Sequence, residues 1–73
     1  MAVYNIDAKG LKCPLPVLKI VAMASTIPGG EILEVLGDCP TFEQDVRKWC
    51  DRESKTLLAV RPQNGALLVQ IQF

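Results

Sequence analysis

The sequence contains no histidine, so the commonest metal ligand and the usual general base are both missing. Its three cysteines, Cys13, Cys39 and Cys50, form no Cys-x-x-Cys pair, and their spacing matches neither a zinc site nor a disulfide framework. These absences argue against Cys–His catalysis, a zinc centre and simple dithiol redox chemistry. We therefore expect no metal and no bound cofactor.

The chain also lacks an excess of charge and a long apolar run. Eight basic and eight acidic side chains cancel, whereas a nucleic-acid binder of this size usually carries a basic excess. No run is long enough to span a bilayer, and the start of the chain does not resemble a signal peptide. We expect one small cytoplasmic domain, residues 1–73, with reduced thiols, no direct nucleic-acid binding and no membrane insertion.

The hydrophobic pattern predicts the element order β-α-β-α-β-β. Strands are expected at 3–7, 31–36, 55–61 and 66–73, and helices at 14–27 and 41–53. Asn64-Gly65 between two apolar runs predicts a hairpin. Two amphipathic helices pack most economically on one face of a mixed four-stranded sheet, so we predict an α/β two-layer sandwich.

Helical periodicity assigns a core side to each predicted helix. The stripe of the second helix makes Cys50 a packed core thiol beside Trp49. The sequence allows two starts for the second helix. Either Asp38 or Cys39 caps the helix with Pro40 at the first helical position, or Thr41 and Gln44 form a capping box. Leu15 falls on the outer side of the first helix. The predicted core residues are Val17, Ile20, Val21, Ala24 and Ile27 in the first helix, and Phe42, Val46, Trp49 and Cys50 in the second.

Cys13 lies at the start of the first helix, between Lys12 and Pro14. Proline is well tolerated in a first helical turn, and the free amides and dipole there lower the pKa of a thiol. The alternative is a small buried hydrophobic side chain. Because no histidine is available as a base, a reactive Cys13 points to a thiolate that accepts and passes on a group.

Residues 7–18, Asp-Ala-Lys-Gly-Leu-Lys-Cys-Pro-Leu-Pro-Val-Leu, resemble the Asp-x-x-Gly-Leu-x-Cys-Pro-x-Pro signature of the TusA/SirA/YeeD-like sulfur carrier family. The resemblance extends over essentially the whole chain. It implies a sandwich similar to the C-terminal domain of bacterial translation initiation factor three, and a sulfane sulfur carried as a covalent persulfide on Cys13. The signature positions expected to support the motif are Asp7, Gly10, Leu11, Pro14 and Pro16, and those expected to dock partners are Lys12 and Leu15.

The resemblance also implies partners. Family donors include cysteine desulfurases and rhodanese-type sulfurtransferases. Acceptors include DsrE-like proteins in tRNA thiolation or sulfur oxidation, and some members work beside thiosulfate permeases. A relay protein of this kind need not be a stand-alone enzyme. Two alternatives stay open: an adaptor that binds through Leu15 without sulfur chemistry, and a thiol-redox protein that uses Cys13 and Cys39.

Asp38-Cys39-Pro40 departs from the Asp-Asp-Pro or Asp-Pro common in the family. If both helices start at the same edge of the sheet, two Cys-Pro corners lie near one another. Cys39 would then share the sulfur or resolve Cys13 as a disulfide; otherwise it is a loop thiol that replaces a cap. We also expect Asp7 to accept hydrogen bonds from the turn at 10–13.

Overall fold

The computed structural model describes residues 3–12 and 15–73, so Cys13 and Pro14 lie outside the described residues. The predicted order of elements is confirmed. The elements are β1 (Val3–Asp7), α1 (Leu15–Ala24), β2 (Ile32–Gly37), α2 (Phe42–Glu53), β3 (Thr56–Gln63) and β4 (Ala66–Gln72).

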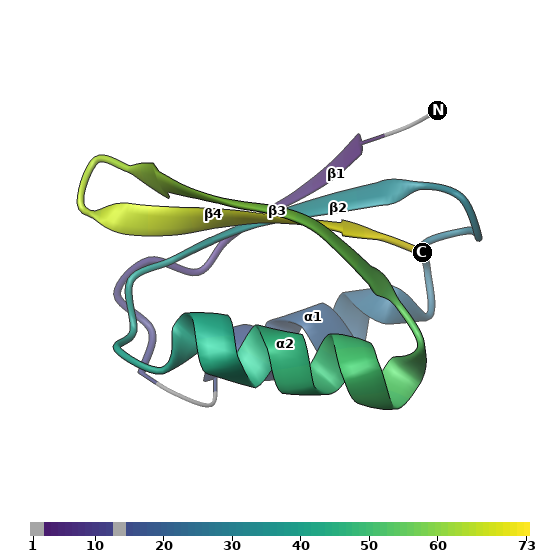
Figure 1. The fold of residues 1–73 in the computed structure, drawn as a ribbon, viewed down its shortest axis with the longest axis horizontal. Helices are drawn as coiled ribbons and strands as arrows, with labels where there is room; N and C mark the ends of the chain where they lie inside the picture. Colours follow the sequence, from purple (N-terminus) through teal and green to yellow (C-terminus); the bar gives the residue numbers. More distant parts are fainter. Residues whose placement is uncertain (1–2, 13–14) are drawn as a thin grey trace.

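The four strands form one mixed sheet in the order β1-β2-β4-β3. β1 pairs with β2 in parallel, and the other two pairs are antiparallel. Figure 1 shows α1 and α2 side by side beneath one face of the sheet, while the opposite face carries no helix. This arrangement is the predicted two-layer sandwich. It leaves β1 and β3 as the edges of the sheet.

The core lies between the sheet and the two helices. The apolar stripe predicted for α2 is confirmed, since Phe42, Val46, Trp49 and Cys50 are all buried. Strands β2 and β4 supply the facing side chains, at alternate positions as a strand with one buried face requires. The buried strand residues of this face are Leu33, Val35, Val69 and Ile71.

The predicted core face of α1 is partly wrong. Pro16 and Ile20 are its buried residues, but the side chain of Val21 is 46% exposed. Almost every residue of α1 is apolar, so periodicity defines the centre of its buried face poorly. The helix also ends at Ala24, three residues earlier than predicted, and Ile27 is buried in the turn that follows.

The hairpin between β3 and β4 is confirmed. Asn64 and Gly65 form its two-residue turn, and both have positive φ, at 50° and 81°. Two consecutive positive φ values define the type I′ turn, which Asn-Gly adopts readily. Because the turn is so short, β3 extends to Gln63 and includes Pro62, which an edge strand tolerates.

Of the predicted starts of α2, the one at Thr41 is right in position, but the expected capping box with Gln44 is wrong, and neither Asp38 nor Cys39 is the N-cap. Thr41 is the N-cap residue, but its side chain makes no capping bond to the helix backbone. Its hydroxyl instead donates to Oδ2 of Asp45 over 3.0 Å. The φ and ψ of Thr41, −104° and 13°, differ from the extended conformation of a capping residue, so its hydroxyl is not aimed at the backbone amides.

A close contact between Gly37 and Phe42 yields a test of the packing. A Cβ added at Gly37 would lie 2.8 Å from the Phe42 ring, which is buried. We expect Gly37→Ala to lower the free energy of unfolding by about 1–3 kcal/mol, measured by urea denaturation. Gly29→Ala is the matched control, because a Cβ there meets no atom within 4 Å. Equal stability of the two variants would contradict this account.

Candidate functional site

The loop from β1 to α1 is folded by bonds within its first residues. The amide of Lys9 donates to Oδ1 of Asp7 over 3.1 Å, and the amide of Leu11 donates to the carbonyl of Ala8 over 3.3 Å. Gly10 has φ +82°, a conformation that side chains with a Cβ rarely adopt. Asp7 is therefore a turn acceptor, although its donor is Lys9, one residue before the turn we expected.

A second loop, between β2 and α2, holds the first in place. The amide of Gly10 donates to Oδ1 of Asp38 over 3.0 Å, across 28 residues of sequence. Sequence reasoning treated Asp38 only as a possible helix cap and missed this role. A signal was present, because Asp38 follows the strand that pairs in parallel with β1, and parallel strands end at the same edge of a sheet.

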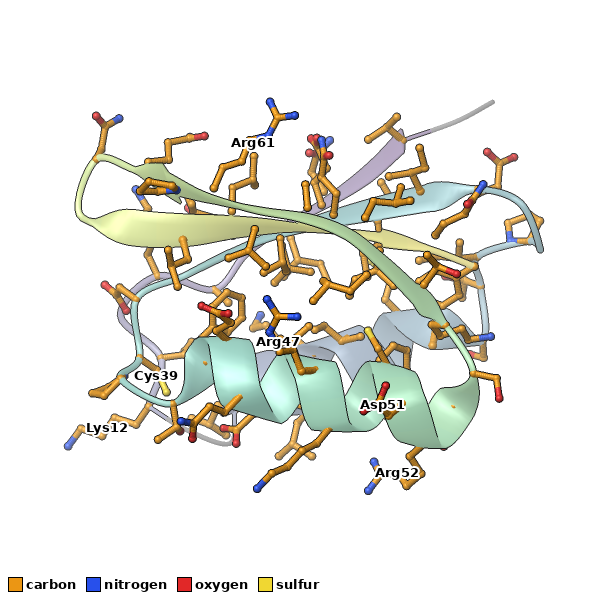
Figure 2. All side chains as sticks on the ribbon, in the orientation of Figure 1. Lys12, Cys39, Arg47, Asp51, Arg52 and Arg61 are labelled. Carbon is orange, nitrogen blue, oxygen red and sulfur yellow. The ribbon has the colours of Figure 1, made fainter. Side chains whose placement is uncertain are left out.

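The two loops enclose a groove of about 440 Å³. Figure 2 shows Lys12 and Cys39 at this end of the molecule, with Lys12 directed outward. Cys39 is only 8% exposed, and its sulfur lies 3.8 Å from the hydroxyl of Thr41. The groove is lined by Gly10, Leu11 and Lys12 from the first loop and by Asp38, Cys39, Pro40 and Thr41 from the second.

The start of α1 leaves few backbone donors for a ligand. The amide of Leu15 donates to the carbonyl of Lys12 over 2.8 Å, so this amide is already used. Pro16 is buried and has no amide hydrogen. Leu11 is half-buried and packs against the core. Lys12 and Leu15 are both exposed, as docking residues must be.

Cys50 lies away from this groove, in the core. It is 2% exposed, on the stripe of α2 that faces the sheet. Burial raises the pKa of its thiol above the ordinary value of 9.0, the nearby carboxylate of Asp51 raises it further, and Arg47 opposes them. Cys50 therefore stays protonated and poorly nucleophilic at neutral pH. The prediction of a packed core thiol is confirmed.

Two other features bear on function. In the segments 3–12 and 15–73, no group of three or more Cys, Asp or Glu side chains is arranged to hold a metal ion. Neither α1 nor α2, the helices described, has the length and hydropathy needed to cross a membrane.

The fold and the groove place the chain among small α/β sandwiches whose two helix-initiating loops meet at one end of the sheet. More specifically, residues 4–72 match the family model described as sulfurtransferase TusA, and the chain belongs to this family. The family membership supports a sulfur carrier role and implies sulfur relay partners in general.

Relatives and a solved structure agree with this membership. The chain is 31% identical to the sulfur carrier protein TusA of Pseudomonas syringae, over 93% of this chain and 81% of that protein. It is also 31% identical to a putative sulfur carrier protein of Aquifex aeolicus, over 93% of this chain, but it spans only 34% of that longer protein. The structure of a SirA-like protein from Desulfitobacterium hafniense superposes with a TM-score of 0.80 at 28% identity, covering 97% of this chain and 96% of that one.

The bond between the two loops can be tested by hydrogen exchange. We expect Asp38→Ala to accelerate exchange of the Gly10 amide, because the carboxylate oxygen is its acceptor, and to cost about 1 kcal/mol of stability. Asp38→Asn keeps an oxygen acceptor and should change the rate less. Asp7→Ala is the matched control, since it removes the acceptor of Lys9 instead. Unchanged Gly10 exchange in Asp38→Ala would refute the bond.

Proposed function

We propose that the protein is a sulfur carrier in which Cys13 accepts a sulfane sulfur as a persulfide and passes it to a partner protein. The observation that carries this proposal is the Cys13-Pro14-Leu15-Pro16 motif, whose last two residues begin α1, in a member of the TusA family. We further propose a reducing compartment, the cytoplasm, because in an oxidising one the carrier thiol would be lost as a disulfide.

The transfer needs no metal and no external oxidant. The Cys13 thiolate attacks the outer sulfur of a donor persulfide, a new S–S bond forms, and the donor cysteine leaves as a thiolate. In the second step an acceptor thiolate attacks the outer sulfur on Cys13, whose own thiolate leaves. Atoms and electrons balance in each step, so the protein must supply only a nucleophilic sulfur and access to it.

The surroundings of the motif favour an anionic sulfur. Lys9 and Lys12 supply positive charge in the loop before Cys13, and the first turn of α1 contains no acidic residue to oppose it. The positive end of the α1 dipole adds to this field. Because the Leu15 amide is bonded to Lys12, we assign the stabilisation to these charges and the dipole, with no direct bond from Leu15.

Partner docking is proposed at Lys12 and Leu15, the exposed residues on either side of Cys13-Pro14 in the sequence. Sulfur transfer requires direct contact between the sulfur atoms of the two proteins. The partner must therefore cover the surface around Cys13, which includes Lys12 and Leu15. The proposed donor is a cysteine desulfurase or a rhodanese-type sulfurtransferase. The proposed acceptor is a DsrE-like protein, and a nearby thiosulfate permease would supply thiosulfate to the donor reaction.

Intact mass spectrometry tests the carrier function. After incubation with a cysteine desulfurase and cysteine, or with a rhodanese and thiosulfate, we expect the protein to gain one sulfur atom that a reductant removes. Cys13→Ser should abolish the gain, because the nucleophile is lost. Cys50→Ser is the control, since its buried, protonated thiol should take no part. An unchanged mass with both donors, with partner binding intact in Cys13→Ser, would favour the adaptor.

We also propose Cys39 as a second thiol that acts on the Cys13 persulfide. The support is its position, in the groove that it shares with Gly10, Leu11 and Lys12, the residues directly before Cys13. Attack of a Cys39 thiolate on the outer sulfur moves the sulfur to Cys39. Attack on the inner sulfur forms a Cys13–Cys39 disulfide and releases hydrosulfide, and this step also balances without an oxidant.

Proteolytic mapping tests the role of Cys39. After charging or mild oxidation, with free thiols then alkylated, we expect peptides joined through Cys13 and Cys39 and none joined through Cys50. Cys39→Ser should abolish the joined peptides while the first gain of sulfur persists, because Cys13 alone accepts it. If no such bridge forms under either condition, the second thiol has no role and Cys39 is a structural residue.

A further inference from the structure

The outer edge of β1 presents a set of backbone groups that face no other strand. The amide of Ala8 donates to the carbonyl of Leu36 in β2 over 2.7 Å, and successive residues of a strand alternate in direction. The backbone groups of Val3, Asn5 and Asp7 are therefore directed away from β2, toward the free edge. They offer alternating donors and acceptors to an added strand.

The two edges of the sheet differ in their protection. β3 has an irregular register between Leu57 and Ala59, and it carries Pro62 and an exposed Arg61 near its end. Bulges, prolines and charges are the usual means by which an edge strand avoids pairing with another chain. β1 contains no proline, lysine or arginine, its charged residue Asp7 stands at its last position, and its register with β2 is regular throughout. Only β1, of the two described edges, is open to pairing.

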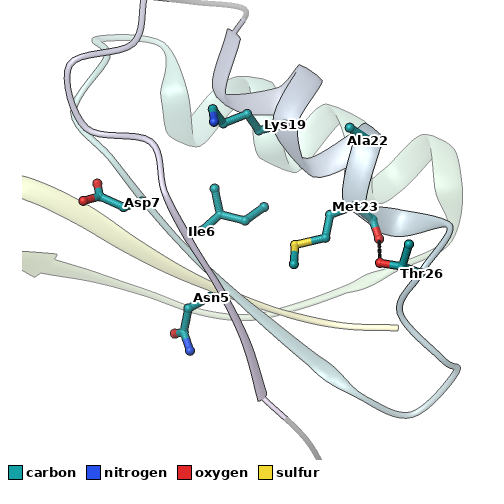
Figure 3. Close-up of a pocket in the computed structure, with 7 residues that line it drawn as sticks. All are labelled: Asn5, Ile6, Asp7, Lys19, Ala22, Met23 and Thr26. Atoms are coloured by element: carbon teal, nitrogen blue, oxygen red, sulfur yellow. Dashed lines mark hydrogen bonds between the residues drawn. The ribbon is translucent and has the colours of Figure 1, made fainter.

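A groove of about 530 Å³ runs between β1 and α1. In Figure 3, Ile6 and Met23 extend into the space between strand and helix, and Lys19 lies on the helix toward the end where Asp7 is found. Lys19 forms no ion pair with any residue in the described segments. The groove is lined by Asn5, Ile6, Asp7, Lys19, Ala22, Met23 and Thr26.

We propose that this edge and groove bind an extended segment of another protein, which adds to β1 as a fifth strand. The backbone of the segment would pair with Val3, Asn5 and Asp7. Its side chains on the helix side would alternate between an acidic residue near Lys19 and an apolar residue near Ile6 and Met23. Lys19 to Thr26 spans about 10 Å of helix, which accommodates two side chains spaced two residues apart on a strand.

A second copy of the chain fits this edge poorly. Twofold pairing of β1 with itself would bring an α1 helix from each copy beside the same edge, so the two helices would have to share the space next to it. An isolated extended segment brings no helix, and its acidic residue complements Lys19. This surface does not include Cys13, so the inference stands independently of the sulfur chemistry.

The probe is a short synthetic peptide of alternating threonine and valine, with one groove-facing valine replaced by glutamate. We expect it to shift the amide resonances of Val3–Asp7 and Lys19–Thr26, and not those of β3, in a nuclear magnetic resonance titration. Lys19→Glu should weaken the binding about tenfold, because one attraction becomes a repulsion. The same peptide with lysine in place of glutamate should then prefer Lys19→Glu. Lys48→Glu, on α2 outside the groove, should leave both affinities unchanged.

Asn5→Pro tests the backbone pairing. The Asn5 amide faces away from β2, so proline removes an outward donor and spares the β1–β2 bonds; retained thermal unfolding would verify the fold. We expect this variant, and a peptide N-methylated on its β1-facing amides, to abolish binding. Binding unaffected by both changes, or no shift of β1 at about 1 mM peptide, would overturn the proposal. Protection of the outward amides of Val3, Asn5 and Asp7 in the protein alone, with a dimeric mass, would also overturn it in favour of a second copy.

Discussion

The parallel pairing of β1 with β2 is the constraint on which the site depends. Two neighbouring parallel strands run in the same direction, so their carboxyl ends lie next to each other. The loops that follow the two strands therefore emerge side by side. Each loop leads into a helix on the same face. The starts of α1 and α2 therefore meet at one end, and the bond from Gly10 to Asp38 holds the two loops together. Cys39, in the second loop, therefore lines one groove with Gly10, Leu11 and Lys12 of the first.

This arrangement explains how so small a protein can support sulfur transfer. The core fills the space between sheet and helices, and the groove at the loops borders it, because Cys39 belongs to both. Of the two described cysteines, Cys50 is in the core with a raised pKa, whereas Cys39 lines the groove. Both side chains are buried, at 2% for Cys50 and 8% for Cys39, so they differ in position: Cys50 lies within the core, and Cys39 lies where the core meets the groove.

Much of the fold follows from the sequence because its signals are local. The Asn64-Gly65 turn, the alternation along β4 and the stripe from Phe42 to Cys50 each specify one structure. The core face of α1 did not follow, since a helix that is apolar almost all round has no clear buried side. The cap of α2 was also mispredicted, because the backbone angles of Thr41 direct its hydroxyl to Asp45. The role of Asp38 depends on a contact across 28 residues, which no local pattern encodes.

The same topology also accounts for the difference between the two sheet edges. The first strand of the sheet must lead directly into the loop that carries Cys13, so Asp7 and the residues after it are occupied with forming that turn. The hairpin of β3 and β4 leads into no such loop. Its strand β3 carries the register irregularity, the proline and the charge that protect it from pairing. The proposed binding edge is an unprotected β1 beside a partly apolar groove that both Lys19 and Asp7 line. It continues along the chain into the loop before Cys13, the residue proposed to carry sulfur.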